Sequence, residues 1–241
     1  IGGVKTTMRA PIKVILEKQF QLPVLVDNDA NVAALGELYF GAGKGKKNFI
    51  FLILGTGIGG AIVIDGRIYR GATGRAGEFG HMSVDPGGPI CGCGNLGCLH
   101  LYASGHSIAK RALQLIAERK AGDSQIVALA GPVKSAKELA QKVTAEIVFA
   151  AANQGDQLAK EVIDRSINYL GLALVNLINA FNPEAVIIGG GLVAAGPVIF
   201  EQLNKIVEQS VRKELFGQVP VIPALLGDDA GLVGAVMLAK Q

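Results

Sequence analysis

One short stretch of the chain holds all three of its cysteines and one of its three histidines. The residues are His81, Cys91, Cys93 and Cys98, separated by nine, one and four other residues. Thiolates and a neutral imidazole are ligands that zinc prefers, and four protein ligands are typical of a closed structural site. The alternative is three small, buried free cysteines. The clustering of every cysteine beside a histidine in a glycine-rich loop favours the metal site.

A carboxylate stands close to the same histidine. Glu78 precedes His81 by three residues, a spacing that places both side chains on one face of a helical turn. A carboxylate and an imidazole together can bind vicinal hydroxyl groups. If one nitrogen of His81 binds the metal, the other can still donate to a sugar hydroxyl. The alternative is an exposed glutamate beside a purely structural ligand.

A second acidic element lies near the start of the chain, at Asp27-Asn28-Asp29-Ala30-Asn31. Asp29 follows a predicted strand and opens a predicted helix. The helix dipole and the free N–H groups of the first turn stabilise a carboxylate at that place. Spacing alone therefore favours a capping role for Asp27 or Asp29.

Two glycine-rich turns follow apolar runs that we expect to be strands. One is Gly55-Thr56-Gly57-Ile58-Gly59-Gly60 and the other is Gly189-Gly190-Gly191. Glycines allow the backbone to approach a phosphate closely, and backbone N–H groups supply the donors. The first turn joins two strands and opens no helix, so it is not a dinucleotide-binding fingerprint. The alternatives are a tight hairpin and an ordinary strand-to-helix turn.

Together these motifs resemble the ROK family of sugar kinases and sugar-responsive repressors, with bacterial glucokinases the nearest members. The resemblance runs from about Leu22 to the end of the chain, and its motifs occur in the family's order. The elements that carry it are Asp27-Asn28-Asp29-Ala30-Asn31, the glycine signature from Leu54 to Gly66, Arg75-Ala76-Gly77-Glu78-Phe79-Gly80-His81, and the cysteine loop. The resemblance implies the α/β actin-like ATPase (ribonuclease H-like) fold, mainly its large C-terminal lobe.

The resemblance also implies ATP-dependent phosphorylation of a hexose, glucose or a related sugar, in a cytoplasmic homodimer that uses Mg²⁺ and structural zinc. Asp29 would be the catalytic base. The sugar contacts would come from Asn28, Glu78, His81 and His100. Contacts to ATP would come from Gly55, Thr56, Gly57 and Gly59 at the phosphates and from Gly189, Gly190 and Gly191 at the adenosine. The zinc ligands would be His81, Cys91, Cys93 and Cys98.

Two departures from the family pattern stand out. The family carries a sugar-contacting glutamate two residues after the last cysteine, where this sequence has His100. The family also begins with an Asp-x-Gly-x-Thr hairpin that binds phosphate and Mg²⁺, and residues 1–7 contain no aspartate. We therefore expect this chain to lack most of the small lobe and to turn over poorly by itself. The alternatives to a kinase are a sugar-sensing transcriptional regulator and a catalytically silent truncated form.

Composition sets outer limits on the function. Half of the 241 residues are hydrophobic, which is enough for a full core, and glycine is abundant at 33 residues. A net charge of +3 without a basic stripe predicts no nucleic-acid module in this chain. No signal peptide is recognisable. The apolar stretch Ile167–Phe181 is too short for a membrane span. The expected protein is therefore soluble and cytoplasmic.

Periodicity predicts the elements that must position these residues. Strands are expected over 22–26, 49–54, 60–64, 185–188 and 219–223, with Asp65-Gly66 as a hairpin turn into residues 67–69. Helices are expected over 30–40, 103–119 with Ser104 as cap, several within 136–181, and then over 197–215 and 231–240. Strands alternating with helices indicate an α/β protein. We divide it into a small-lobe remnant with the aspartate element (1–40), a large lobe (41–225) and a closing helix (226–241).

Overall fold

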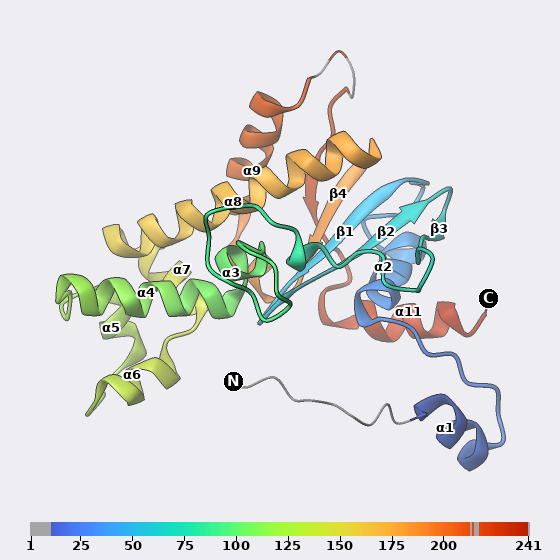
Figure 1. The fold of residues 1–241 in the computed structure, drawn as a ribbon, viewed down its shortest axis with the longest axis horizontal. Helices are drawn as coiled ribbons and strands as arrows, with labels where there is room; N and C mark the ends of the chain where they lie inside the picture. Colours follow the sequence, from blue (N-terminus) through green and yellow to red (C-terminus); the bar gives the residue numbers. More distant parts are fainter. Residues whose placement is uncertain (1–10, 213, 215–216, 241) are drawn as a thin grey trace.

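A five-stranded mixed sheet forms the centre of the molecule (Figure 1). The structure is a computed structural model, and it describes residues 11–212, 214 and 217–240. The strand order is β3-β2-β1-β4-β5; β1 pairs antiparallel with β2 and parallel with β4. The strands are β1 (Phe49–Leu54), β2 (Ile58–Ile64), β3 (Arg67–Ile68), β4 (Ala185–Gly189) and β5 (Val221–Pro223). The carboxyl ends of the parallel strands β1 and β4 therefore meet at one edge.

Helices cover both faces of this sheet, because each strand alternates its side chains between the faces. Phe49 and Phe51 of β1 pack with α2 (Asp29–Phe40) on one face, where α2 also lies against α11 (Ala230–Leu238). Ile50, Leu52 and Leu54 point to the larger core on the other face. The helices of that side include α4 (Gly105–Arg119), α7 (Ala145–Asn153), α8 (Gln157–Phe181) and α9 (Pro197–Ser210).

Shorter helices complete the described part of the chain. They are α1 (Ile12–Phe20), α3 (His100–Ala103), α5 (Gln125–Ala130), α6 (Ala136–Lys142), and the 3-10 turns η1 (Phe79–His81), η2 (Gly191–Ala195) and η3 (Gly227–Asp229). Helix α1 stands apart from the sheet and has no buried residue. Within the described residues, no helix combines the length and the apolar character that crossing a bilayer requires.

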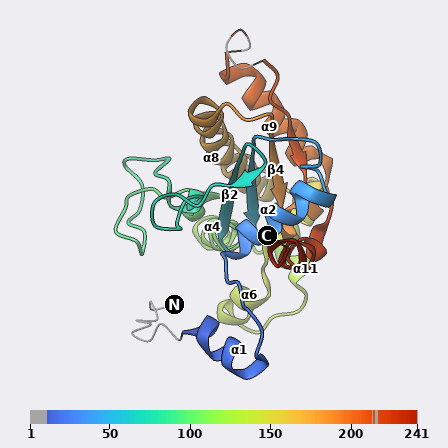
Figure 2. The same ribbon diagram turned by 90° about the vertical axis from the view of Figure 1, so that its right-hand side faces the viewer.

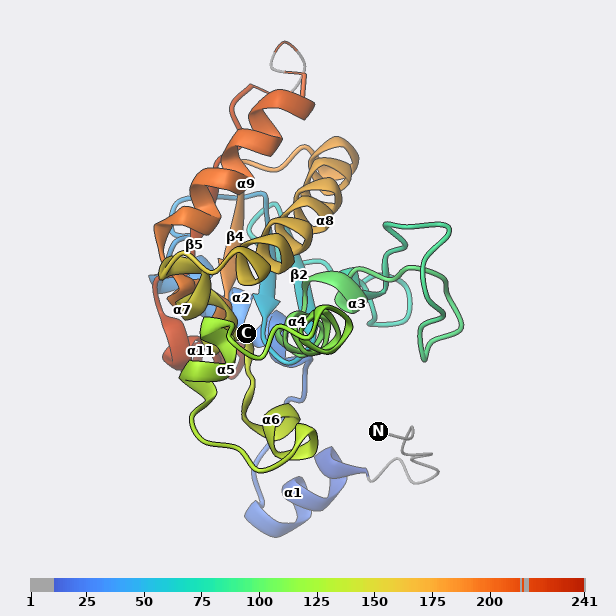
Figure 3. The same ribbon diagram turned by 90° about the vertical axis from the view of Figure 1, so that its left-hand side faces the viewer.

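A long loop joins β3 to α3 and projects from one side of the sheet (Figures 2 and 3). It contains η1 and the three cysteines. Backbone bridges between Ser83 and Cys98 and between Ile90 and Leu96 fold the loop back on itself. The cysteines therefore lie in a loop whose two halves are joined by antiparallel backbone bridges.

Most predicted elements are confirmed. The predicted helix over 30–40 is α2, and the strands at 49–54 and 185–188 are β1 and β4, which ends at Gly189. Asp65 and Gly66 have φ values of 51° and 72°, as a hairpin turn with two left-handed residues requires. The region 136–181 does contain several helices.

Other boundaries differ from the predictions. The helix predicted from Ala103 is broken at Ser104, which ends α3 and caps α4 by accepting a hydrogen bond from the Ser107 N–H. The helix predicted over 197–215 ends at Ser210, and Leu215 lies outside the described residues. Strand β2 begins two residues earlier than predicted, and β5 begins two residues later.

The prediction of a strand over Leu22–Val26 was wrong. The segment is irregular, and the side chains of Leu22, Leu25 and Val26 are exposed. A strand requires a neighbouring strand for its backbone hydrogen bonds. Among the described residues, no strand pairs with this segment, so its apolar sequence does not produce strand structure here.

Candidate functional site

The start of α2 presents Asp29 to solvent. Asn28 is the capping residue: its Oδ1 accepts hydrogen bonds from the N–H groups of Ala30 (2.9 Å) and Asn31 (3.4 Å). The cap is therefore Asn28 and neither of the aspartates that spacing favoured. Asp29 accepts the Ala30 N–H at Oδ1 (2.8 Å), and its Oδ2 accepts no hydrogen bond from the described residues. One carboxylate oxygen thus remains available to a substrate.

Asp27 anchors this helix start to the segment after β3. Its Oδ2 accepts hydrogen bonds from Arg70 Nη2 (2.6 Å) and Nε (2.9 Å), and its Oδ1 accepts them from Asn31 Nδ2 (2.9 Å) and the Asn28 N–H (2.8 Å). Burial raises the pKa of Asp27, but these hydrogen bonds outweigh it and lower the pKa overall. Sequence reasoning missed Arg70, because no local pattern links it to a residue 43 positions away.

The first glycine turn lies beside this helix start. Residues 55–57 join β1 to β2, and Gly59 continues into β2 opposite Ile53. A Cβ atom at Gly59 would lie 3.5 Å from the Cβ of Ala30, the residue after Asp29. The carbonyl oxygen of Gly55 accepts a hydrogen bond from the Gly105 N–H (2.8 Å), which places the start of α4 against the same turn.

The second glycine turn approaches the first from β4. Gly190 has φ of 90°, and a side chain there would collide with the carbonyl oxygen of Leu54, the last residue of β1. Glycine is therefore required both by conformation and by space. The two glycine turns meet at the carboxyl ends of two parallel strands, where open α/β sheets commonly bind ligands.

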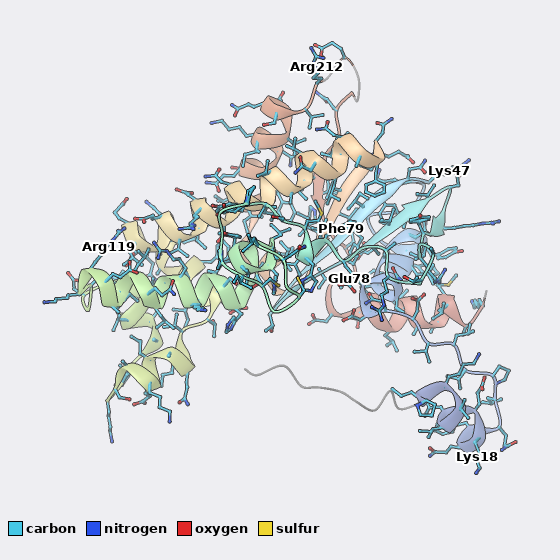
Figure 4. The ribbon with its side chains drawn as sticks, viewed as in Figure 1. Lys18, Lys47, Glu78, Phe79, Arg119 and Arg212 are labelled. Carbon is cyan, nitrogen blue, oxygen red and sulfur yellow. The ribbon has the colours of Figure 1, made fainter. Side chains whose placement is uncertain are left out.

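The turn that carries Glu78 packs onto the opening of β2. A side chain at Gly80 would collide with the carbonyl oxygen of Ile58, so this close approach also requires glycine. Phe79 is buried, whereas Glu78 and His81 are exposed. Figure 4 shows Glu78 and Phe79 in the middle of the molecule, on the short turn at the base of the cysteine loop. The structure therefore brings the Glu78 turn to the same sheet edge as the glycine turns.

The four predicted metal ligands converge in the loop. Their ligand atoms all lie within 4.8 Å of one another. The Cys93 and Cys98 Sγ atoms are 3.6 Å apart, and the Cys91 Sγ atom is 3.6 Å from His81 Nδ1. A tetrahedral zinc with bonds of about 2.3 Å to sulfur and about 2.05 Å to nitrogen has S–S edges of about 3.8 Å and S–N edges of about 3.6 Å. These two separations fit the edges of a tetrahedral metal site, and the remaining ligand atoms lie within 4.8 Å.

The thiols of this cluster differ in acidity. Burial raises the pKa of Cys98 to about 12. A hydrogen bond from the backbone N–H of Asn95, with a second from Cys91, lowers the pKa of Cys93 to about 7. Deprotonating a buried thiol beside other sulfurs is costly unless a cation balances the charge. A bound divalent ion would supply that charge and hold all three sulfurs as thiolates.

His100 lies at the border between the cysteine cluster and the sheet edge. Its Nε2 is 3.1 Å from the Sγ of Cys91, and its ring centroid is 5.0 Å from that of His81. Burial lowers the pKa of His100, and the nearby His81 and His106 lower it further. A neutral ring can donate one N–H to the sulfur. The sequence predicted a sugar contact for His100; its contact with Cys91 was not predicted.

The comparisons with known proteins agree with the sequence motifs. A model of the ROK family matches residues 4–241. A glucokinase from Halalkalibacterium halodurans is 42% identical over 232 residues, which cover 96% of this chain and 68% of the relative. A xylose repressor from Bacillus spizizenii is 32% identical over 223 residues, which cover 92% of this chain and 52% of the repressor.

The fold comparison leads to the same group of proteins. The crystal structure of a ROK family glucokinase from Streptomyces griseus, in complex with glucose and AMPPNP, matches with a TM-score of 0.77 at 38% identity. The match covers 96% of this chain and 72% of that one. The predicted actin-like ATPase fold is therefore confirmed.

Proposed function

This chain belongs to the ROK family, and we propose that its function is the ATP-dependent phosphorylation of a hexose, glucose or a related sugar. The observation that carries the proposal is the convergence of three motifs at one sheet edge. Ile58 and Gly59 belong to the Gly55–Gly60 turn and are the first residues of β2. Ala30 of the Asp29 helix start lies against Gly59, and Gly80 of the Glu78 turn lies against Ile58. The similarity to glucokinases supports the same reaction.

We assign the role of catalytic base to Asp29. Its exposed carboxylate has one oxygen without a hydrogen bond from the described residues. Phosphoryl transfer has a loose transition state, so the base mainly has to hold and orient the attacking hydroxyl and accept its proton late. The clamp between Asp27 and Arg70 supports this role by holding the helix start in place.

We assign sugar binding to four side chains, which are Asn28, Glu78, His81 and His100. The Oδ1 of Asn28 is used in capping α2, so its Nδ2 is the group left to donate to a sugar hydroxyl. Glu78 is acceptor-only when ionised and complements that donor. His100 replaces an anion of the family pattern with a group that can donate, so we expect it to influence which hexose is preferred.

ATP with Mg²⁺ is assigned to the two glycine turns. The phosphates would lie on the backbone N–H groups of Gly55, Thr56, Gly57 and Gly59, and the adenosine on Gly189, Gly190 and Gly191. The meeting of the turns at Leu54 and Gly190 supports one continuous nucleotide site. Preorganised donors of this kind stabilise the charge that develops on the transferred group.

We further propose that the metal of the loop is structural zinc, held by His81, Cys91, Cys93 and Cys98. Four protein ligands leave no open position, and the ion would supply rigidity to the loop that carries His81. The proposal also includes a cytoplasmic location, a homodimer and a division of the chain into residues 1–40, 41–225 and 226–241. They rest on the family resemblance.

The test is Asp29→Asn in the full-length protein. We expect turnover in a coupled assay with ATP, Mg²⁺ and glucose to fall by at least about a hundredfold, because a positioned base is removed. Glucose binding, measured by calorimetry, should change little. Asp65→Asn is the matched control, because Asp65 is an exposed turn residue that makes no contact with this sheet edge. Unchanged turnover in Asp29→Asn would move the base elsewhere.

A sugar-responsive regulator is the second candidate, and its support is the similarity to xylose repressors. Both functions need a sugar site, but only the kinase needs the carboxylate of Asp29. Binding of glucose or xylose by the full-length protein, with no ATP-dependent product formed under the same conditions, would favour the regulator. A catalytically silent form would show neither sugar binding nor product.

A further inference from the structure

A separate pocket of about 330 Å³ lies where the cysteine loop meets α4 and α8. These two helices run side by side beyond the loop (Figures 1 and 3). The loop contributes Ile90, α3 contributes Tyr102, α4 contributes Lys110 and Arg111, and α8 contributes Arg165. None of the residues assigned above to sugar, ATP or metal lines this pocket.

The pocket is strongly basic. Three of its lining residues are permanent cations, Lys110, Arg111 and Arg165, and His106 adds an imidazole. No aspartate or glutamate is among the lining residues. Lys110 and Arg165 form no ion pair with any described residue, and Arg111 has only a 3.8 Å contact to the exposed Glu118. Two anions outside the lining, Asp85 and Glu161, interact electrostatically with Arg165, and Glu161 is already paired with Arg119. The lining itself therefore carries a net positive charge.

Arg165 lies beside two stacked aromatic rings, and its N–H groups donate no hydrogen bond to the described residues. Its guanidinium carbon lies 5.7 Å from the ring centroids of both Tyr102 and Tyr169, which stack at 4.0 Å. The carboxylate behind the rings, Asp85, accepts hydrogen bonds from both tyrosine hydroxyls, at 2.7 and 3.3 Å. The planar fork of guanidinium donors is therefore available to an anion.

We propose that this pocket binds a phosphorylated monosaccharide. Arginine binds phosphate through paired N–H donors, and lysine adds a point charge. The volume lies near the lower limit of small-molecule sites, which suits a ligand of monosaccharide size. Ser107 and Ser166 donate their hydroxyl protons to backbone carbonyls, at 2.6 and 2.8 Å, and the Ser107 oxygen also accepts a hydrogen bond from the Ser104 hydroxyl at 3.0 Å. Each of the two oxygens keeps at least one lone pair that can accept a hydrogen bond from a sugar hydroxyl.

The experiment uses glucose 6-phosphate as the probe. Its binding to the full-length protein is measured by calorimetry in saturating glucose, which occupies the proposed hexose site. The ring signals of His106 are followed by NMR at the same time. The chain has only three histidines, so this signal can be assigned with a His106→Asn variant. A local readout in the pocket does not depend on whether Asp29 is catalytic, so the two proposals fail independently.

We expect glucose 6-phosphate to shift the His106 signals and to bind more weakly as salt is added. Lys110→Gln and Arg165→Gln should each weaken binding by about tenfold, as the loss of one charge-assisted contact implies. Lys137→Gln, which removes an equivalent exposed charge on α6, is the matched control and should bind like the wild type. Lys110 makes no hydrogen bond or ion pair with the described residues, so its substitution should not disturb folding.

Three outcomes would overturn the proposal. In the first, glucose 6-phosphate leaves the His106 signals unmoved. In the second, Lys110→Gln binds as tightly as Lys137→Gln, which would place the ligand elsewhere. In the third, inorganic phosphate alone shifts His106 with the same affinity, which would leave an anion site with no role for a sugar.

Discussion

The guanidinium of Arg70 donates two hydrogen bonds, of 2.6 and 2.9 Å, to one carboxylate oxygen of Asp27. The two residues are 43 positions apart and join the segment after β3 to the start of α2. The Asp27 side chain is 10% exposed and the Arg70 side chain 40%. Solvent therefore screens part of the ion pair, but the geometry fixes the helix that begins with Asp29.

Removing Arg70 should loosen this helix start. We expect Arg70→Ala to lower the free energy of unfolding by about 1 kcal/mol, because the pair is partly exposed. Urea denaturation measures the change. Arg75→Ala is the matched control, because Arg75 is exposed and forms no ion pair with the described residues. Equal stability of the two variants would show that the pair contributes nothing.

The same carboxylate predicts a dependence of stability on pH. The pKa of Asp27 is lowered in the folded protein, despite burial, by hydrogen bonds from Asn31 and Arg70. Its contribution to the free energy of unfolding is therefore fully present above the pKa of about 3.9 in the unfolded chain. That contribution is lost as the pH falls through the lower pKa of the folded protein. The stability difference between the wild type and Asp27→Asn should be largest near pH 7 and shrink below about pH 4. A difference that grows in acid would contradict this.

A buried carboxylate of α2 holds this helix to the segment that leads into α11 on the same face of the sheet. Glu37 is fully buried in α2 and accepts hydrogen bonds from the N–H groups of Ala42 (2.7 Å), Leu225 (3.2 Å) and Leu226 (2.8 Å), the last two just before α11. In Glu37→Gln the amide NH₂ would face at least one of these donors. We expect a loss of about 2 kcal/mol in unfolding free energy, measured by urea denaturation. Glu118→Gln, an exposed glutamate, should change little.

Removal of the proposed metal should disorder the cysteine loop and leave the sheet core folded. Protein purified without added zinc should contain about one equivalent per chain, as a closed four-ligand site implies. Cys93→Ser should release the metal, raise hydrogen exchange over residues 82–99 and abolish glucose binding with it. The sheet core is distant from Cys93 in sequence and should keep its protection. A metal-free protein with an ordered loop and normal glucose binding would rule out the site.

Elements with strong local signals could be predicted from the sequence. Continuous apolar runs identified β1 and β4, Asp65-Gly66 identified the hairpin, and Ser104 was recognised as a cap. The clustering of the four proposed metal ligands could also be predicted, because His81 and the cysteines lie within one short loop whose spacing limits their separation. In each case the physical cause acts over a few neighbouring residues.

Relationships between distant segments were decided only by the tertiary structure. The strand predicted over 22–26 depends on a partner that its own sequence does not supply. The contacts of Arg70 with Asp27 and of Glu37 with Leu226 join residues 43 and 189 positions apart. The basic pocket likewise combines a loop with three helices. Side-chain type and spacing determined which chemistry this chain can carry, whereas packing decided which of those groups meet, because such contacts depend on how whole elements cross the sheet.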